Sequence, residues 1–600
     1  MSSNSLSFPR QVGYLAADIG QRYRWRIPVL VLLMTAVALI EGLGMVLLLP
    51  LLNAVGISGQ AGSGFFAGIV DGIVAATGVG GSPYHLVLLV LAVFALQMLL
   101  FLGQTWWVAW LQRDYGAYWQ RHLFSLLLQA RWSFISGLKL GSMTNQIAQE
   151  TIRLSSAVLI LAQLAAVAVT AFVYVVVACL ISWRVTLLMV GFAALLFRAV
   201  RGIGRRNYLI GLRLGPLAAE LNVLLTEFLG GIKLIKATAT EEVAERRVSE
   251  VVDELRVQHT WATFLPALVR AIFEFAAITG LCFLLVFGYS SLNIAAASML
   301  VVLALFIRLL PRFNTLQQNI QLLATYVPAF SDAQQLARTA AAATEVAAVL
   351  PRAVQVTARS DPLEIDITAG GYDGVTTLRD IRLAFPEAGV VGIVGESGAG
   401  KSTLVNCLLG LAEIQQGSVS FAGREMRSVS LSSWRRQFGY VPQETVLFHQ
   451  SIRDNIAWGN PDADDWAVEA AARQALAHDF ILQQPAGYAT VIGDHGARLS
   501  GGQRQRLGIA RAILGDPRLL VMDEATSALD STSEAAVLET VESLRSSICI
   551  VMVAHRLATV RKSDVIIVLS KGRVIEKGTW AELMMKQGAF YRLARDQNIE

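Results

Sequence analysis

The fold of the C-terminal half is decided by VVGIVGESGAGKSTLV (residues 390–405). An apolar run typical of a buried strand leads into a glycine-rich turn, and a helix start follows. Gly395, Gly400, Lys401 and Ser402 match the P-loop pattern, in which backbone N–H groups wrap a phosphate. The lysine of that pattern bridges the outer phosphates, and the hydroxyl binds Mg²⁺. The stretch therefore predicts a nucleotide-binding α/β domain.

Two further apolar runs end on residues that suit phosphoryl transfer. RLLVMDEATSALD (518–530) places Asp523 and Glu524 at the end of a predicted strand, where one carboxylate can hold the Mg²⁺ shell and the other can polarise the attacking water. VMVAHRLATV (551–560) places His555 at a strand end, from which it can reach the γ-phosphate. The alternative for His555 is a structural histidine with satisfied hydrogen bonds. Together the runs predict ATP hydrolysis with ATP and Mg²⁺ as cofactors, and Glu524 and His555 as catalytic residues.

A second anion-binding helix start lies between these runs, in LSGGQRQRLGIARAIL (499–514). Ser500, Gly501 and Gly502 offer a hydroxyl and backbone donors at the beginning of a predicted helix. One nucleotide has a single γ-phosphate, and the P-loop already accounts for it. The simplest resolution is that the second site serves ATP bound to another copy of the chain, which predicts a homodimer.

The N-terminal half is too apolar to be soluble. The chain has 600 residues, of which 54% are hydrophobic, and its mean hydropathy is +0.52. A net charge of +5 is small for this length and argues against nucleic acid as a partner. Four scattered cysteines give no disulfide framework. The apolar segments of spanning length are residues 27–55, 84–110, 155–182, 185–204, 262–288 and 293–313.

The orientation of these spans follows from their Lys and Arg residues. The connections between spans 2 and 3 and between spans 4 and 5 are long and basic, whereas the opposite connections contain only Arg184. By the positive-inside rule both termini are cytoplasmic. The basic connections are rich in helix formers, so we expect the spanning helices to continue into the cytoplasm. The alternative is an independent cytoplasmic domain inserted in each connection. The outer segment GFFAGIVDGIVAATGV (64–79) either lies at the membrane surface or caps neighbouring helices.

The set GESGAGKS, Gln443 in YVPQE, LSGGQ, VMDE, SALD and His555 resembles the ABC-transporter ATPase domain over residues 361–600. With six spans ahead of it, the chain resembles an ABC exporter half-transporter of the type IV exporter fold. This resemblance implies a multidomain membrane protein in the inner membrane of a bacterium, with a cytoplasmic ATPase domain. The implied domains are a six-helix transmembrane domain with long cytoplasmic helix extensions (1–330), a linker (331–360) and the P-loop α/β ATPase domain (361–600). Coupling helices are implied near residues 133–141 and 236–246.

The same resemblance implies roles at matching positions. Tyr372 would stack on adenine, Gln443 would sense Mg²⁺, and Asp530 would couple the two sites of the dimer. Metal contacts would come from Ser402, Gln443 and Asp523. The implied nucleotide contacts are Tyr372, Gly395, Glu396, Ser397, Gly398, Ala399, Gly400, Lys401, Ser402, Thr403, Gln443, Ser500, Gly501, Gly502, Gln503 and Asp530. Two positions depart from the family pattern: Gly370 replaces an aromatic residue, and Asp494 replaces a glutamate.

Charged residues in the spans are candidates for substrate contact. FIRLLPRFN (306–314) places Arg308 about 22 Å down the last span, and span 5 brings two charged residues to a similar depth. Spans 5 and 6 together carry three arginines and one glutamate at this depth. The excess of positive charge could bind an anionic headgroup. The alternatives are that Glu274 pairs with an arginine while the others reach the lipid headgroups, and that Glu41 makes an interhelical hydrogen bond. The full candidate set is Glu41, Arg270, Glu274, Arg308 and Arg312.

Short membrane motifs suggest a cargo. IEGLGMVLLLP (40–50), LALFIRLLP (303–311) and the pair Arg270 with Glu274 resemble bacterial flippases of lipid-linked oligosaccharides and related glycolipid exporters. The prediction is ATP-driven export or flipping of an amphipathic substrate, with membrane lipid as a partner. The alternatives are a peptide or drug exporter and an ATP-gated channel or regulator. Six spans exclude a soluble ATPase that acts on nucleic acid.

Overall fold

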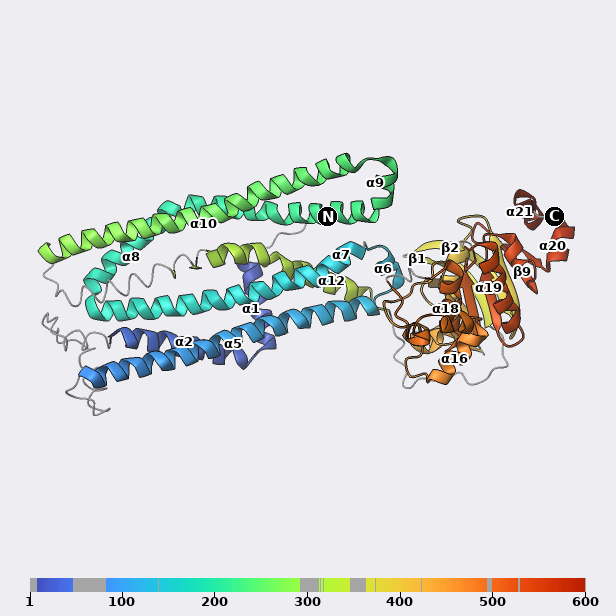
Figure 1. Ribbon diagram of the computed structural model, residues 1–600, viewed down its shortest axis with the longest axis horizontal. Coiled ribbons are helices and arrows are strands. Elements are labelled where there is room, and N and C mark those ends of the chain that lie inside the picture. The colour runs from blue at the N-terminus through green and yellow to red at the C-terminus, as the bar shows by residue number, and fades with distance from the viewer. Residues whose placement is uncertain are drawn as a thin grey trace. The chain divides into compact units, whose positions relative to one another are not determined.

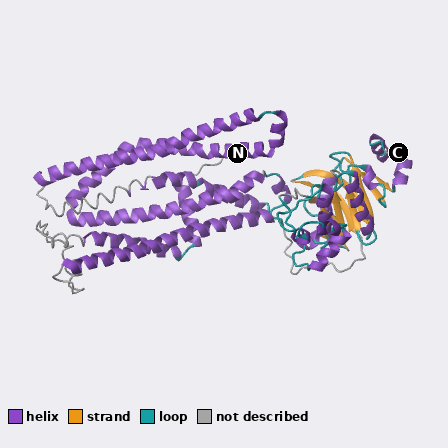
Figure 2. Ribbon diagram, viewed as in Figure 1, coloured by secondary structure: helices purple, strands orange, loops and turns teal. Residues whose placement is uncertain are grey.

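The computed structural model divides the chain into two compact units. One unit holds Met1–Gln129 and Leu138–Ala342, and the other holds Ala130–Gly137 and Ala343–Glu600. The structure describes residues 8–46, 83–138, 140–291, 312, 315–316, 318–345, 363–372, 374–421, 423–493, 499–526 and 529–598. All strands named below belong to the second unit, as the colouring of Figure 2 makes plain.

The first unit is helical. Its longest elements are α5, α8 and α10, and an apolar core that includes Leu15, Tyr115 and Tyr174 lies between its helices. Pro83 opens α5, where its missing N–H costs no helical hydrogen bond. The helices are α1 (Phe8–Arg22), α2 (Arg26–Val46), α5 (Pro83–Gln129), α7 (Leu140–Asn145), a π-helical turn Gln146–Glu150, α8 (Thr151–Gly230), α9 (Ile232–Thr238), α10 (Glu241–Ser291) and α12 (Pro328–Ala342).

Helix α8 differs from the expected pair of spans. Residues 182–184 were expected to connect two separate helices, but helical hydrogen bonding continues from Thr151 to Gly230. Figure 1 shows the ribbon of α8 turning back on itself, so that it contacts α5 with one part and α10 with another. The three-residue connection contains no Gly or Pro and so has no signal that ends a helix, which explains why helical hydrogen bonding is not interrupted there.

Three described helices are long and apolar enough to cross a membrane: Arg26–Gly44, Val87–Gln129 and Met143–Cys179. They overlap the first three predicted spans (27–55, 84–110 and 155–182), with different bounds. The sixth predicted span and the outer segment 64–79 lie almost wholly outside the described residues. The first unit extends to Ala342, beyond the predicted boundary at 330, because α12 buries Ala333, Leu336 and Ala340 on its apolar face.

The second unit is built on two sheets. A four-stranded antiparallel sheet has the order β2-β1-β4-β5, and a six-stranded sheet has the order β10-β9-β3-β8-β7-β6. In the larger sheet all neighbouring pairs are parallel except β9 with β10. The strands are β1 (Leu363–Tyr372), β2 (Val375–Phe385), β3 (Gly389–Gly395), β4 (Glu413–Phe421), β5 (Arg424–Glu425), β6 (Phe438–Val441), β7 (Leu519–Asp523), β8 (Cys549–Val553), β9 (Val565–Ser570) and β10 (Arg573–Gly578).

Helices cover the larger sheet, and Figure 1 shows α18 and α19 beside it. Strands β3, β7 and β8 are buried along almost their whole length, which explains their continuous apolar sequence. The helices are α6 (Trp132–Ser136), α13 (Lys401–Leu408), α14 (Leu431–Arg435), α15 (Ile452–Ala457), α16 (Asp465–Gln474), α17 (His478–Leu482), α18 (Gly501–Ile513), α19 (Ser531–Leu544), α20 (Trp580–Lys586) and α21 (Ala589–Asp596), with 3₁₀ turns at Met426–Ser428, Gly487–Ala489 and Leu557–Val560.

The two predicted coupling segments have different surroundings. Helix α6 belongs to the compact unit that contains the ATPase fold, although it follows α5 directly in sequence. The Arg131 N–H donates to the Ala343 carbonyl over 2.8 Å. The second segment (236–246) covers the end of α9, a turn at Ala239 with φ of 52°, and the start of α10.

Candidate functional site

Four neighbouring parallel strands bring the predicted residues to one edge of the larger sheet. Strand β3 leads into the P-loop, β7 into Glu524, β8 into His555 and β6 into Gln443. These strands are adjacent in the order β3-β8-β7-β6. Because the carboxyl ends of parallel strands meet at the same edge, motifs that are far apart in sequence share one site.

The P-loop has the backbone that phosphate binding requires. Gly395, Gly398 and Gly400 have φ of 156°, 78° and 103°, conformations that side chains disfavour. At Gly395 a Cβ would lie 2.2 Å from the Leu569 carbonyl oxygen, so that only glycine fits. At Gly398 a Cβ would meet nothing within 4 Å, which leaves the loop open to a ligand. Gly400 caps α13 without a side chain and exposes the helix start.

Lys401 is buried and Asp523 is half-buried beside this loop. The Lys401 ammonium donates to the carbonyls of Gly395 (2.8 Å) and Glu396 (3.1 Å), and the residue is only 7% exposed. Burial lowers the pKa of Lys401, and burial together with the neighbouring Glu524 carboxylate raises the pKa of Asp523. A buried cation beside two carboxylates forms a polar site in a low-dielectric setting, in which phosphate and Mg²⁺ would gain strong interactions.

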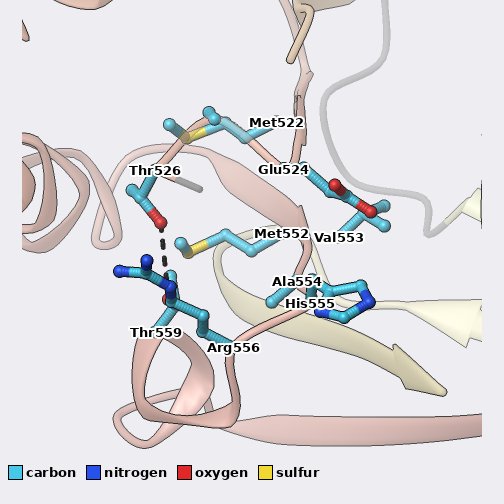
Figure 3. Close-up of a pocket in the computed structure, with 10 residues that line it drawn as sticks. Met522, Glu524, Thr526, Met552, Val553, Ala554, His555, Arg556 and Thr559 are labelled. Atoms are coloured by element: carbon cyan, nitrogen blue, oxygen red, sulfur yellow. Dashed lines mark hydrogen bonds between the residues drawn. The ribbon is translucent and has the colours of Figure 1, made fainter. Parts of the chain in front are cut away.

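Glu524 has a strained backbone. Its φ of 47° lies in the left-handed region, which non-glycine residues rarely adopt. Its N–H donates to the Val553 carbonyl over 2.9 Å, and its carboxylate accepts from the Gln443 amide over 3.0 Å. Figure 3 shows the Glu524 carboxylate and the His555 ring on the same side of a pocket that both residues line. The geometry fits a carboxylate that orients water next to a γ-phosphate.

The residues present fit ATP and Mg²⁺. The described part of the chain has no cluster of three or more His, Cys, Asp or Glu that could hold a metal by itself. Mg²⁺ usually binds one or two carboxylates together with substrate phosphates, and Asp523 offers such a carboxylate at the end of β7. The side chains of Ser402, Gln443 and Asp523 would supply the protein ligands.

The signature helix α18 begins with a capping box. The Ser500 hydroxyl accepts from the Gln503 N–H over 3.2 Å, and the Gln503 side chain accepts from the Ser500 N–H over 2.9 Å. The Ser500 oxygen expected to be free for an anion is therefore partly used, while the N–H groups of Gly501 and Gly502 stand at the helix start. A Cβ on Gly502 would lie 2.5 Å from the Ser533 side chain, so α18 packs tightly on the start of α19.

Asp530 caps helix α19. Its carboxylate accepts from the Ser533 N–H over 3.4 Å, and hydrogen bonding to Ser533 lowers the pKa of Asp530. Because a Cβ at Gly502 would also meet Ser533, the start of the signature helix packs closely against the segment that Asp530 caps. The coupling role predicted for Asp530 stays a prediction.

Tyr372 lines a cavity of about 200 Å³ together with Trp132 and Ser133 of α6. Its hydroxyl accepts from the Asn406 amide over 2.6 Å, and burial raises its pKa. The missing aromatic residue at Gly370 has a steric reason. A Cβ there would lie 3.1 Å from Ile367 and 3.4 Å from the Cys407 sulfur, so an aromatic side chain has no room. Adenine stacking by Tyr372 stays a prediction.

Several polar residues of the site carry no sequence signal. Gln505 accepts from the Thr445 hydroxyl over 2.7 Å and donates to the Pro442 carbonyl over 3.4 Å, which ties α18 to the loop of Gln443. Glu534 accepts from the Thr559 hydroxyl over 3.2 Å in the loop that carries His555. These partners lie far apart in sequence, and no local spacing could have found them.

The candidate substrate residues form two ion pairs. Arg312 lies 3.8 Å from Glu41, whose side chain is 8% exposed, and Arg270 lies 2.7 Å from Glu274 on the same helix. The expected excess of positive charge is thus smaller among the described residues than the sequence suggested. Arg308 and Asp494 lie outside the described residues.

Comparisons with known proteins agree with this arrangement. The chain matches the family models "ABC transporter transmembrane region" over residues 43–311 and "ABC transporter" over residues 378–527. It is 32% identical to an ATP-dependent lipid A-core flippase of Syntrophus aciditrophicus, over 68% of this chain and 68% of that protein. The chain belongs to the ABC transporter family. In this ABC transporter a helical membrane domain is fused to an ATPase domain that binds ATP and couples its hydrolysis to transport.

Two further matches cover most of the chain. It is 30% identical to the heterocyst differentiation ATP-binding protein HepA of Nostoc sp., over 80% of this chain and 78% of that protein. The structure of a bacterial Atm1-family ABC exporter with ATP bound matches with a TM-score of 0.73 and 23% identity, covering 96% of this chain and 99% of the other. These matches confirm the predicted fold class. The six spans, their bounds and the role of each site residue stay predictions.

Proposed function

We propose that this transporter works as a homodimer that moves an amphipathic substrate outward from the cytoplasmic side or the inner leaflet of a bacterial inner membrane, with both termini and the ATPase domain cytoplasmic. The best candidate is a lipid-linked oligosaccharide or glycolipid. The observation that carries the proposal is the convergence of the P-loop, Glu524, His555 and Gln443 at one sheet edge in a chain that also contains a membrane domain.

Two features support a second copy as partner. The start of α18 presents backbone donors with a capping box, a second anion-binding helix start besides the P-loop. Apolar side chains are exposed in and just before the second coupling segment (236–246): Val243 lies within it, and Leu229, Ile232 and Leu234 precede it. An exposed apolar face on a cytoplasmic extension suits a protein partner. The ATPase domain of a second copy is the partner that we propose for it.

The cargo proposal rests on charge and on relatives. Arg312 is 40% exposed although it pairs with Glu41, so part of its guanidinium remains available to an anionic group. Two relatives are named ATP-dependent lipid A-core flippases, from Syntrophus aciditrophicus and Chromohalobacter salexigens. A relative from Staphylococcus aureus is named a multidrug export ATP-binding/permease protein and is 42% identical over 37% of this chain. A drug or peptide exporter is therefore the second candidate.

The test is ATP-dependent translocation of a polyprenyl-pyrophosphate oligosaccharide in proteoliposomes. We expect transport with the unmodified chain and none with Glu524→Gln, which removes the carboxylate that orients water. A double variant, Arg308→Ala with Arg312→Ala, should lose transport and keep basal ATP hydrolysis. Arg338→Gln, which removes an exposed arginine of α12, serves as the control. If the unmodified chain hydrolyses ATP briskly and moves no glycan, the lipid-linked cargo is wrong, and a drug and peptide panel follows.

A companion pair of variants separates cargo contact from ion pairing. If Arg312 acts only by neutralising Glu41, Arg312→Gln removes the positive charge 3.8 Å from a buried carboxylate, and adding Glu41→Gln should restore transport. If Arg312 also binds the cargo, the double variant Glu41→Gln with Arg312→Gln should remain defective. ATP-driven ion current without substrate movement would instead favour a channel.

A further inference from the structure

The loop that carries His555 is held by a side chain from the far end of the chain. The Gln597 amide nitrogen donates to the His555 carbonyl over 2.8 Å, and the Gln597 amide oxygen accepts from the Leu557 N–H, also over 2.8 Å. One side-chain amide thus bridges two peptide units on either side of Arg556. Since these peptide units are fixed, the direction in which the His555 side chain leaves the backbone is restricted.

The element that presents Gln597 is itself anchored. Gln597 follows α21, and its N–H donates to the Ala594 carbonyl over 3.2 Å. Phe590 and Ala594 are fully buried, and the ring of Phe590 packs edge-on against Trp580 with centroids 5.1 Å apart. The Glu576 carboxylate of β10 accepts from the N–H groups of Ala589 (2.6 Å) and Phe590 (2.9 Å) at the helix start. The amide is therefore presented by a fixed helix.

The opposite side of the same loop is tied to the helix that begins after Asp530. Glu534 of α19 accepts from the Thr559 hydroxyl over 3.2 Å and lies 3.8 Å from the Arg556 guanidinium. Figure 3 shows the Thr526 hydroxyl directed toward the same threonine, and the two hydroxyl oxygens lie 3.4 Å apart. These contacts hold the later part of the loop. The Gln597 amide contacts the backbone at His555 itself.

We infer that Gln597 is a positioning residue for His555, which holds the imidazole at the edge where the γ-phosphate of ATP would lie. This inference rests on the proposed role of His555. Both hydrogen bonds of the Gln597 side chain are made to backbone atoms. The contact therefore orients the His555 ring without using the ring nitrogens. A glutamate at position 597 could still accept from the Leu557 N–H, but it would place a carboxylate oxygen against the His555 carbonyl.

The test uses the full-length transporter in lipid nanodiscs, with kcat and KM for ATP measured separately. Gln597→Ala loses both hydrogen bonds, and Gln597→Glu loses the bond to the His555 carbonyl and places a carboxylate oxygen against it. Both variants should lower kcat about 5- to 10-fold and leave KM within about twofold. Asp596→Asn changes the neighbouring exposed residue and should leave both constants unchanged. A melting temperature close to that of the unmodified chain shows that the variants are folded, and Gln597→Glu keeps the side-chain length. An unchanged kcat in both Gln597 variants overturns the inference.

A double-variant cycle shows whether Gln597 acts through His555. In the His555→Ala background, Gln597→Ala should have no further effect on the residual rate of release of radiolabelled phosphate. An equal fold-loss in both backgrounds would mean that Gln597 acts elsewhere and would overturn the inference. If His555→Ala alone keeps full kcat, the proposed role of His555 is wrong, which is a different failure. If His555→Ala lowers kcat and the Gln597 variants do not, only the positioning role of Gln597 is refuted.

Discussion

Glu345 anchors the segment that follows α12 onto the ATPase unit. Its carboxylate accepts two hydrogen bonds from Arg435, at 2.9 and 2.7 Å. Arg435 also donates to the carbonyls of Leu409 (3.1 Å) and Gly410 (3.0 Å), which follow the P-loop helix α13. We predict that Glu345→Gln loosens this segment, because glutamine keeps the shape and loses the charge and the second acceptor oxygen.

The size of the effect follows from the geometry. A hydrogen bond to a charged group that is shielded from water stabilises a fold by about 1.5–3 kcal/mol, whereas a solvent-exposed ion pair contributes about 0–1 kcal/mol. The Arg435 and Glu345 side chains are 33% and 22% exposed, which places the loss between those limits, at about 1–2 kcal/mol. Opening of the segment frees the Arg131 N–H from the Ala343 carbonyl. Its hydrogen exchange should therefore accelerate about 5- to 30-fold.

The assay is hydrogen exchange of the full-length transporter, followed in peptides that contain Arg131. The control is Glu413→Gln, which removes the same charge from another residue that lines the cavity beside Glu345. An Arg131 amide that exchanges at the unmodified rate in Glu345→Gln would refute the reasoning, and so would equal acceleration in both variants. Acceleration in Glu345→Gln alone would show that the ion pair holds the segment.

Three further outcomes follow from buried contacts. Trp434→Phe removes the indole donor that bonds the carbonyl at the end of α13 over 2.7 Å, and we expect a loss of about 1–3 kcal/mol, seen as a lower melting temperature. Gly502→Ala should lower ATPase activity about tenfold or more while fluorescent ATP still binds, because the new Cβ would meet Ser533 at 2.5 Å. Burial raises the pKa of Cys407 and Cys549 to about 12, so the folded chain holds more protons than the unfolded chain above about pH 8.5. Stability should therefore fall as pH rises from about 8.5 toward about 12, as measured by unfolding midpoints in urea at pH 8 and pH 10.

The nucleotide site could be predicted from sequence because its residues stand at strand ends. Each motif couples an apolar run to a functional residue just beyond it, as with Glu524 after β7 and Gln443 after β6. Parallel pairing of the strands then brings these ends together without further information. The glycine positions could be predicted for a similar reason, since the left-handed backbone of Gly400 is itself a requirement of the loop.

The contacts that support the site could not be predicted in this way. The Gln597 side chain donates to the backbone carbonyl of His555. Every residue has such a carbonyl, so the sequence does not indicate which one is used. Glu345 and Arg435 are separated by 90 positions, and each is an ordinary charged residue in its local context. Such partners are chosen by tertiary packing, which local patterns do not encode. The continuous α8 shows the same limit, because no residue that ends a helix marks in the sequence the place where the ribbon turns back.

The charged residues of the predicted spans include one ion pair that the sequence spacing predicts and one that it does not. Arg270 and Glu274 are four positions apart on one helix, a spacing that predicts their pairing, whereas the pairing of Glu41 with Arg312 joins distant helices. Each described arginine of the candidate set therefore has a carboxylate partner. Arg308 lies outside the described residues, so these two pairs give no account of it. A substitution at Arg312 also alters the surroundings of the buried Glu41 carboxylate, so the comparison of Arg312→Gln with the double variant Glu41→Gln and Arg312→Gln is the measurement that separates charge pairing from contact with an anionic cargo.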